Sequence, residues 1–497
     1  MVDLGSNTFR LVVFRHQPDG AFQQVDEIRE VVRLSGDQQG GRLAPDAVAR
    51  ARRTVRLYAA FCRAAAIDEV LAVATSAIRE ADNRDEVVAA IAEEGLPVRI
   101  LSAEEEARYA YLGVVNSTTL RNGLILDVGG GSAQVARVVD RELRQTWSAP
   151  LGAVRMTEAF LSEDVSSRGQ VKALRRHVED ALATASWAHL DEGRLVGVGG
   201  SVRTLAAMAQ KASAYPLGEV HGFMLHRDAL SDLIDRMAAL PQRQRGRLPG
   251  LKADRADITL AGGLVVATVL DHVGADQLEV GAHGLREGLF FEHLLGGPTP
   301  LLPDVRRASV LNAARIFRYE EAHATHVAHL ALRLLDELGR VGLDPGDERD
   351  RELLWAAGIL HDVGVLVDYN DHHKHSFYLV LNAGLPGFRH RELVMVALLV
   401  RSHRKAQPSV EPFGDILGRG GEARLARLAT CLRIAEQLER GRAQIVTDVR
   451  CTERAGVVTV EVVARDDPSL AVWAAEREAP TFERAFGRRL ELVPAKA

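Results

Sequence analysis

Short apolar segments alternate with amphipathic segments along the N-terminal part of the chain. This pattern predicts strands near residues 8–14, 22–28, 70–74 and 97–101, and helices near 45–65, 84–94 and 103–115. Residues 124–295 show the same alternation of apolar and amphipathic segments. It predicts two hairpin strands, a helix around 170–185, a strand at 195–198, and helices near 201–212, 226–238 and 257–271. Strands that alternate with helices indicate two α/β lobes.

The pattern changes after a Gly- and Pro-rich stretch at 295–303, which we interpret as a linker. Residues 304–440 show helical periodicity, and they hold most of the histidines. The tail pairs strands at 445–450 and 457–464 around Gly456, followed by a helix and a last short strand. The sequence therefore predicts four parts: a first lobe at 1–120, a second lobe at 121–297, a helical domain at 304–440 and a small α+β segment at 441–497.

Charge and composition exclude several classes of function. The formal net charge is −5, so no global basic field favours a nucleic-acid partner. The three cysteines lie far apart in the sequence and form no disulfide framework, which is typical of a reducing compartment. No apolar run is long enough to cross a membrane. We therefore expect a cytoplasmic protein without a membrane or nucleic-acid partner.

Two segments have the same arrangement of an Asp, a tight turn and a strand. Asp3 precedes the turn residues Gly5, Ser6 and Asn7, and Asp127 precedes the turn residues Gly129, Gly130, Gly131 and Ser132. Successive N–H groups of such turns can bind a phosphate, and the preceding Asp can hold a divalent cation. One such turn alone is typical of an ordinary hairpin. The pair favours two similar lobes around a polyphosphorylated ligand.

Further candidates lie at the ends of predicted elements. Ser102 and Glu105 have the spacing of a helix capping box, which leaves Glu106 free to act as a general base in a cleft. Arg79 follows a strand, where it would form either a phosphate clamp or a surface ion pair. The segment Gly199-Gly200-Ser201 joins a strand to a helix, as an anion site or as a turn that needs small residues.

Six motifs in this order resemble the exopolyphosphatase and guanosine pentaphosphate phosphohydrolase (Ppx/GppA) family, over residues 1 to about 295. They are Asp3-Leu4-Gly5-Ser6-Asn7, Ala74-Thr75-Ser76-Ala77-Ile78-Arg79, Glu105-Glu106-Ala107-Arg108, Asp127-Val128-Gly129-Gly130-Gly131-Ser132, Gly199-Gly200-Ser201 and Gly284-Leu285-Arg286-Glu287-Gly288. The resemblance implies two lobes of the actin-like (ASKHA, ribonuclease H-like) fold, which belongs to the α/β class, and a homodimer.

The resemblance also implies roles for single residues. Glu106 would activate the attacking water, while Asp127 and Asp3 would hold Mg²⁺. Arg79 and the Gly turns would bind phosphate oxygens. The chain departs from the family pattern after Ser132, where Ala133-Gln134 stands in place of Thr-Glu. Gln keeps the hydrogen-bonding shape but cannot act as a base and is a poorer ligand for Mg²⁺.

The helical part resembles the HD phosphohydrolase domain through His323, the pair His361-Asp362, and Glu436 in place of the usual final Asp. The resemblance implies an all-α domain that holds a divalent cation such as Mn²⁺ or Fe²⁺ with these four residues. His375 and His403 are candidates for a second metal or for phosphate contacts. A helical scaffold without metal is the alternative.

The leading hypothesis is therefore an Mg²⁺-dependent exopolyphosphatase that releases the terminal phosphate of inorganic polyphosphate between the lobes. One alternative is hydrolysis of guanosine pentaphosphate or another nucleotide, with the chemistry at the HD centre in one form of this hypothesis. The other alternative is a non-catalytic regulator that binds polyphosphate or an alarmone, suggested by Gln134 and Glu436.

Overall fold

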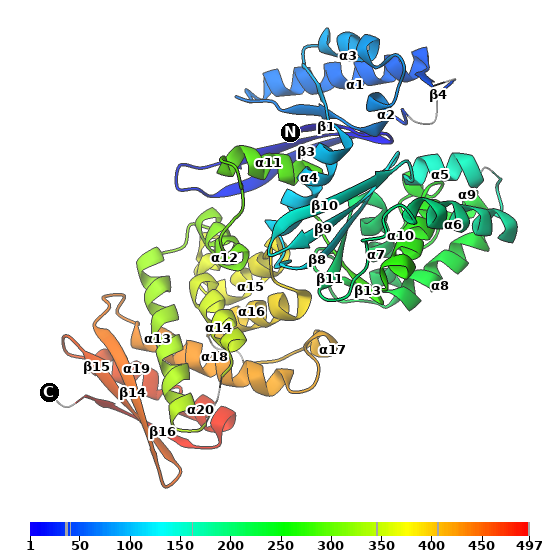
Figure 1. Cartoon of the computed structure of the whole chain (residues 1–497). Helices are drawn as coiled ribbons and strands as arrows, with labels where there is room; N and C mark the ends of the chain where they lie inside the picture. Colours follow the sequence, from blue (N-terminus) through cyan, green and yellow to red (C-terminus); the bar gives the residue numbers. More distant parts are fainter. Residues whose placement is uncertain (35–37, 40, 162, 344–345, 405–406, 496–497) are drawn as a thin grey trace. The chain divides into compact units, whose positions relative to one another are not determined.

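The computed structural model describes residues 1–34, 38–39, 41–161, 163–343, 346–404 and 407–495 (Figure 1). The chain divides into two compact units. One comprises Met1–Arg15 and Gln23–Val305, and the other comprises His16–Phe22 and Arg306–Ala497. Each unit is described by itself below.

The first sheet of the N-terminal unit has the strand order β3-β2-β1-β6-β7. Its strands are β1 (Val2–Leu4), β2 (Thr8–His16), β3 (Phe22–Val31), β6 (Ala72–Ala74) and β7 (Arg99–Ile100). The two-residue strands β4 (Gln38–Gln39) and β5 (Arg42–Leu43) pair separately, and the helices are α1 (Pro45–Ala64), α2 (Ser76–Arg79), α3 (Arg84–Ala92) and α4 (Ala103–Val115). Tyr58 of α1 is fully buried, and its hydroxyl donates to the Phe9 carbonyl at 2.9 Å, which fixes α1 on the sheet.

The second sheet has the order β10-β9-β8-β11-β13-β12. Its strands are β8 (Gly123–Val128), β9 (Ala133–Val139), β10 (Glu142–Ala149), β11 (Arg194–Val198), β12 (Met224–His226) and β13 (Gln277–Val280). The helices are α5 (Ala153–Phe160), α6 (Arg168–Leu182), α7 (Gly199–Ala212), α8 (Arg227–Ala238), α9 (Gln242–Arg245), the 3₁₀ helix η2 (Ala253–Arg255), α10 (Thr259–Val273) and α11 (Leu285–Leu295). Helix α10 is buried along nearly its whole length, which explains why its sequence is apolar all round.

The two sheets repeat one plan. In each, an antiparallel hairpin pairs an Asp with the residue seven positions later: Asp3 with Arg10, and Asp127 with Gln134. In each, a parallel strand then lies beside the strand that carries the Asp and runs directly into a helix, β6 into α2 and β11 into α7. The mixed sheets with helices are those of two actin-like lobes, so the predicted fold class is confirmed.

Helices α4 and α11 pack unusually closely, because glycines lie where they cross. A Cβ atom on Gly113 of α4 would overlap the Gly284 carbonyl, and one on Gly288 of α11 would overlap the Tyr109 carbonyl. Arg108 and Tyr109 also reach Glu292, with Nη1–Oε1 and Oη–Oε2 distances of 2.5 and 2.6 Å. The glycines of the Gly284–Gly288 motif therefore serve this helix contact.

The C-terminal unit is helical up to a small sheet. Its helices are α12 (Val305–Ile316), α13 (Glu321–Arg340), α14 (Glu348–Leu360), the 3₁₀ helix η3 (Val363–Leu366), α15 (His372–Ala383), α16 (His390–Ser402), α17 (Gly414–Leu417) and α18 (Gly421–Leu438). The tail contains β14 (Val446–Arg454), β15 (Val457–Ala464), α19 (Ser469–Glu476), α20 (Ala479–Phe486) and β16 (Arg489–Pro494), with strand order β14-β15-β16. The single helix predicted in the tail is therefore wrong, because α19 and α20 are separate helices divided at Arg477 and Glu478.

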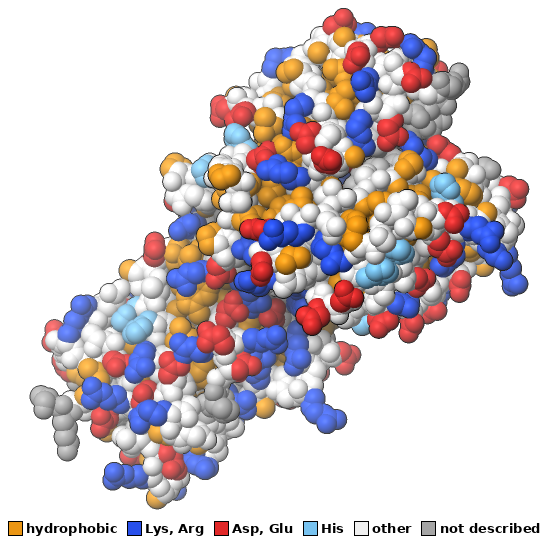
Figure 2. All heavy atoms as spheres, in the orientation of Figure 1, with side chains coloured by type: hydrophobic (Ala, Val, Ile, Leu, Met, Phe, Trp, Pro, Cys, Tyr) orange, Lys and Arg blue, Asp and Glu red, His pale blue; other side chains and the backbone are white. Residues whose placement is uncertain are grey.

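Acidic and basic side chains are interspersed over the face shown in Figure 2. Among the helices that the structure describes, none is both long and apolar enough to span a bilayer.

The contact between α4 and α11 generates a stability prediction. Replacing Gly288 with Ala should lower the free energy of unfolding by about 1–3 kcal/mol, because the new methyl group forces two backbones apart. Gly169 is the control, since a Cβ there meets only ordinary contacts and Ala favours the α6 helix. Thermal melting should show a lower midpoint for Gly288→Ala and an unchanged or higher midpoint for Gly169→Ala. Equal midpoints for both variants would contradict the close packing.

Candidate active site

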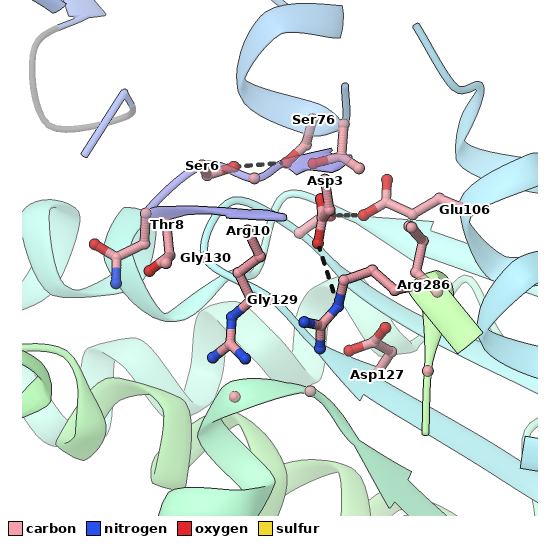
Figure 3. A pocket seen from close by; sticks show the side chains of 18 of the residues that line it. Asp3, Ser6, Thr8, Arg10, Ser76, Glu106, Asp127, Gly129, Gly130 and Arg286 are labelled. Atoms are coloured by element: carbon pink, nitrogen blue, oxygen red, sulfur yellow. Dashed lines mark hydrogen bonds and ion pairs between the residues drawn. The ribbon is translucent and has the colours of Figure 1, made fainter. Parts of the chain in front are cut away.

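A cavity of about 150 Å³ lies in the N-terminal unit where the two hairpin turns and the helix starts converge (Figure 3). Of the residues predicted for the site, it is bordered by Asp3, Gly5, Ser6, Asn7, Glu106, Asp127, Gly129, Gly130, Ser132, Gly199 and Gly200. The structure thus brings residues together from both lobes, and the predicted ones among them lie up to 197 positions apart, the separation of Asp3 and Gly200.

Three carboxylates face this cavity. Asp3 is the middle residue of β1, Asp127 lies near the end of β8, and Glu106 lies in the first turn of α4 (Figure 3). Burial raises the pKa of each, and the proximity of Glu106 and Asp3 adds to the effect on Asp127, whose pKa reaches about 7. Ionised together, these groups repel one another, so the site favours a cation.

Glu106 is held by a chain of hydrogen bonds. Ser102 and Glu105 form the predicted capping box, so the Glu106 side chain takes no part in capping the helix. Its Oε2 accepts from Arg79 Nη1 at 2.8 Å, and its Oε1 lies 3.5 Å from the Ser132 hydroxyl. Burial raises the pKa of Glu106, and the Arg79 hydrogen bond opposes this rise.

Gln134 completes this chain of hydrogen bonds. The Gln134 side chain is buried, and its Nε2 donates to Ser132 Oγ at 2.8 Å. The Ser132 hydroxyl is therefore free to donate its proton to Glu106. The residue that departs from the family pattern thus acts on Glu106 through Ser132.

Three predicted phosphate ligands lie elsewhere. Arg79 donates to Glu106 and to the Leu101 carbonyl at 3.1 Å, so it contacts the base rather than the cavity. Ser201 is buried where a Cβ on Gly262 would lie 2.7 Å from its hydroxyl, so it faces α10. Gly131 packs against Ser6, whose Oγ would lie 2.6 Å from an added Cβ. These three residues support the site without bordering the cavity themselves.

Four arginines that the sequence analysis did not assign border the same cavity. They are Arg10, Arg203, Arg255 and Arg286. Burial and mutual repulsion lower the pKa of Arg203 and Arg255 to about 10. Arg286 Nε lies 4.0 Å from Asp3 Oδ2. The internal repeat could have pointed to Arg203 as a site residue. Arg203 lies in the first turns of the helix after β11, just as Arg79 lies in the helix after β6.

Gly199 shows why the turn after β11 needs glycine. Its φ angle is +90°, and a Cβ would lie 2.5 Å from Asp127 Oδ1. The start of α7 therefore approaches the carboxylate closely, and its free N–H groups are oriented toward the space where an anion would lie.

The predicted residues of the helical part also converge. Glu436 Oε2 lies 3.2 Å from His323 Nε2 and 3.1 Å from His361 Nε2, and Asp362 Oδ2 lies 3.8 Å from His323 Nε2. Burial opposes protonation of His361, but the charges of Asp362 and Glu436 raise its pKa to about 9. His403 joins this cluster and His375 does not. The sequence analysis missed His372, which lies 3.1 Å from Asp362 Oδ1.

The fold and the cavity together define a two-lobed, actin-like protein in which glycine turns and arginines border one cavity. Comparison with family models is more specific. The Ppx/GppA phosphatase family matches residues 12–296, and domain III of the Ppx/GppA phosphatases matches residues 305–467. The chain belongs to the Ppx/GppA phosphatase family, and it is a phosphoanhydride hydrolase. The HD assignment of the helical part stays a prediction.

Solved structures agree with this assignment. A Ppx/GppA family member from Aquifex aeolicus shares 29% identity, with 60% of this chain and 97% of that chain covered and a TM-score of 0.52. Another structure, of an A. aeolicus PPX-GPPA enzyme, shares 30% identity, with coverages of 58% and 97% and a TM-score of 0.50. An exopolyphosphatase from Cytophaga hutchinsonii shares the fold at 22% identity, with coverages of 61% and 98% and a TM-score of 0.56.

The three carboxylates generate a prediction about cations. Mg²⁺ should raise the midpoint of thermal unfolding, by an amount equivalent to roughly 3 kcal/mol at a hundredfold excess over the Kd. Asp127→Asn should be more stable than wild type in the presence of a chelator, because one repelling charge is gone, and should respond little to Mg²⁺. Differential scanning fluorimetry with and without chelator measures both effects. An equal Mg²⁺ response in the two proteins would contradict a cation at these carboxylates.

Proposed function

We propose that the protein is an exopolyphosphatase that releases the terminal phosphate of inorganic polyphosphate in the cavity described above. The observation that carries the proposal is the joint presence of a buried carboxylate base, glycine turns and four arginines around one space. Phosphoryl transfer depends mainly on positioning and on neutralising charge, and these groups supply both.

Glu106 is the proposed general base. It would accept a proton from water at a carboxylate oxygen while the water oxygen forms a bond to the terminal phosphorus. The bond between that phosphorus and its bridging oxygen then breaks, and the shortened chain leaves. Arg79 and Ser132 orient the carboxylate, and the Arg79 hydrogen bond favours its ionised form.

The residues present fit a divalent cation. Asp3 and Asp127 offer oxygen ligands, which Mg²⁺ prefers, and their repulsion in its absence favours binding. When bound, the cation would neutralise charge on the phosphate oxygens. The glycine turns of the two hairpins and the N–H groups at the start of α7 would hold the remaining oxygens.

The lining of the cavity favours polyphosphate over guanosine pentaphosphate. Among the described residues that border it, none is aromatic, so no side chain there would stack on a guanine base. The arginines recognise phosphates, which are all alike along a polyphosphate chain. A cytoplasmic location and a homodimer remain predictions from the sequence.

The decisive test compares two glutamates of the same helical turn. Glu106→Gln keeps the size and an acceptor for Arg79 but removes the base, so phosphate release from long polyphosphate should fall roughly 10²–10⁴-fold. Glu104→Gln is the matched control, because Glu104 is exposed and its activity should stay near wild type. Phosphate release with Mg²⁺ is measured for both variants.

Three outcomes decide between the functions considered. Equal activity of Glu106→Gln and wild type would exclude Glu106 as the base. Binding of polyphosphate without release by wild type would favour the non-catalytic regulator. Release from guanosine pentaphosphate but not from polyphosphate would favour the nucleotide phosphohydrolase.

Arg255 provides a prediction about affinity. Its guanidinium lies over Gly200 at the cavity, and its charge is buried among other arginines. Arg255→Gln should raise the KM for polyphosphate about 10–100-fold with a small change in kcat, because a charge-assisted hydrogen bond is worth about 1.5–3 kcal/mol. Arg247→Gln, at an exposed position nearby in sequence, should leave the KM unchanged. A fall in kcat alone would assign Arg255 to the chemical step instead.

A further inference from the structure

A backbone carbonyl holds the Arg203 guanidinium at the border of the active-site cavity. Arg203 lies on α7, and its Nη1 donates to the Ala282 carbonyl at 3.0 Å. In the first lobe, Arg79 Nη1 donates to the Leu101 carbonyl at 3.1 Å. Each carbonyl lies between a parallel strand and a helix, β7 and α4 for Leu101, and β13 and α11 for Ala282. The internal repeat therefore fixes both arginines in the same way.

The two arginines differ in their second contact. Arg79 also donates to Glu106 at 2.8 Å, and Glu106 is the fourth residue of α4. The fourth residue of α11 is Gly288, which has no side chain to offer Arg203. Burial lowers the pKa of Arg203 to about 10, so its guanidinium stays charged at neutral pH. This charge borders the cavity, and the backbone contact helps to determine where it lies.

A histidine binds the other side of the Ala282 residue. The Ala282 N–H donates to His221 Nδ1 at 3.2 Å, and His221 Nε2 lies 3.0 Å from the Ser117 carbonyl. A backbone N–H can only donate and a carbonyl can only accept. Both contacts therefore require the same neutral tautomer of His221, with its proton on Nε2. Burial favours this neutral form, because it lowers the pKa of His221.

The position of His221 joins two parts of the active site. Ser117 lies two residues past the end of α4, the helix whose first turn carries Glu106. Ala282 lies just before α11 and holds Arg203. His221 thus connects the helix of the proposed base with the peptide that anchors a cavity arginine.

A second ring supports the orientation of His221. His283 packs against it edge to face, with ring centroids 5.1 Å apart and an angle of 82° between the ring planes. Burial lowers the pKa of His283 to about 4, so this ring is neutral at neutral pH and adds no positive charge near Arg203. The plane of the His221 ring is therefore fixed by packing as well as by its two hydrogen bonds.

We infer that His221 is a positioning residue of the active site, which fixes the Ala282 peptide and thereby directs the Arg203 guanidinium at the phosphate to be released. This role rests on the proposed function, in which the cavity takes the end of a phosphate chain. Arg203 would donate to oxygens of the terminal phosphate and neutralise charge on them. His221 touches no phosphate and acts only through Ala282.

Two amides at position 221 separate the two hydrogen bonds of the ring. His221→Asn keeps an acceptor near Nδ1 for the Ala282 N–H, whereas His221→Gln keeps a donor near Nε2 for the Ser117 carbonyl. The kcat/KM for phosphate release from polyphosphate should fall about 10-fold in His221→Gln, because a misplaced charged donor is costly. His221→Asn should lose much less. His226→Gln is the matched control at an exposed position and should behave as wild type.

A double variant shows whether His221 acts through Arg203. Arg203→Gln removes the charged group that His221 is inferred to direct. In that background, His221→Gln should therefore cause little further loss of kcat/KM. A further loss of about 10-fold, as large as in the wild-type background, would overturn the inference. Equal losses in His221→Asn and His221→Gln would also overturn it, and circular dichroism checks that all variants are folded.

Two measurements do not depend on phosphate release. Hydrogen exchange of residues 278–285 in the ligand-free protein should be faster in His221→Gln than in wild type or His221→Asn. Unchanged exchange in His221→Gln would overturn the role of the Ala282 contact. If wild type releases no phosphate from polyphosphate, the proposed function fails. Calorimetry with tripolyphosphate then tests the inference by itself: a Kd raised about 10-fold in His221→Gln supports it, and an unchanged Kd overturns it.

Discussion

Repulsion between like charges is the constraint on which the active site depends. Asp3, Glu106 and Asp127 are buried around one cavity, and four arginines border the same space. Neither set is stable by itself, because burial disfavours every one of these charges. A bound cation would relieve the repulsion among the carboxylates, and a bound phosphate chain would relieve that among the arginines. The fold therefore buries two sets of like charges, and a cation and a phosphate ligand together would neutralise them.

The charged groups come from the same arrangement of strands in each lobe and not from a separate loop. Each sheet has an Asp one residue before the end of a strand, paired with a residue seven positions later, and this second position differs between the lobes. Arg10 adds charge to the cavity, whereas Gln134 donates to Ser132 and so acts on Glu106 through Ser132. A Glu at this position could accept the Ser132 proton, and Ser132 would then no longer donate to Glu106. The neutral amide of Gln134 therefore leaves the Ser132 hydroxyl able to donate to Glu106.

Much of this could be predicted from the sequence, because the signals are local. The Asp–Gly turns, the capping box that frees Glu106 and the alternation of strands and helices each lie within a short window. Arg255 could not be assigned, because only the tertiary fold brings the short helix η2 to the cavity, whereas the internal repeat carried a signal for Arg203. For Ser201, the sequence could not show that its side chain packs toward Gly262 of α10, because that contact exists only in the folded chain.

The helical cluster shows a second limit of sequence reasoning. His372 and His375 differ by less than one helical turn, so which of them faces the cluster depends on where α15 begins. That start is set by Asp371, which adopts a left-handed conformation with φ of +55°. His361 and His403, by contrast, lie just past helix C-termini, where the last carbonyls lack backbone donors and accept from Nδ1 instead. The same unsatisfied carbonyls that end α14 and α16 therefore orient the Nε2 atoms toward the centre of the cluster.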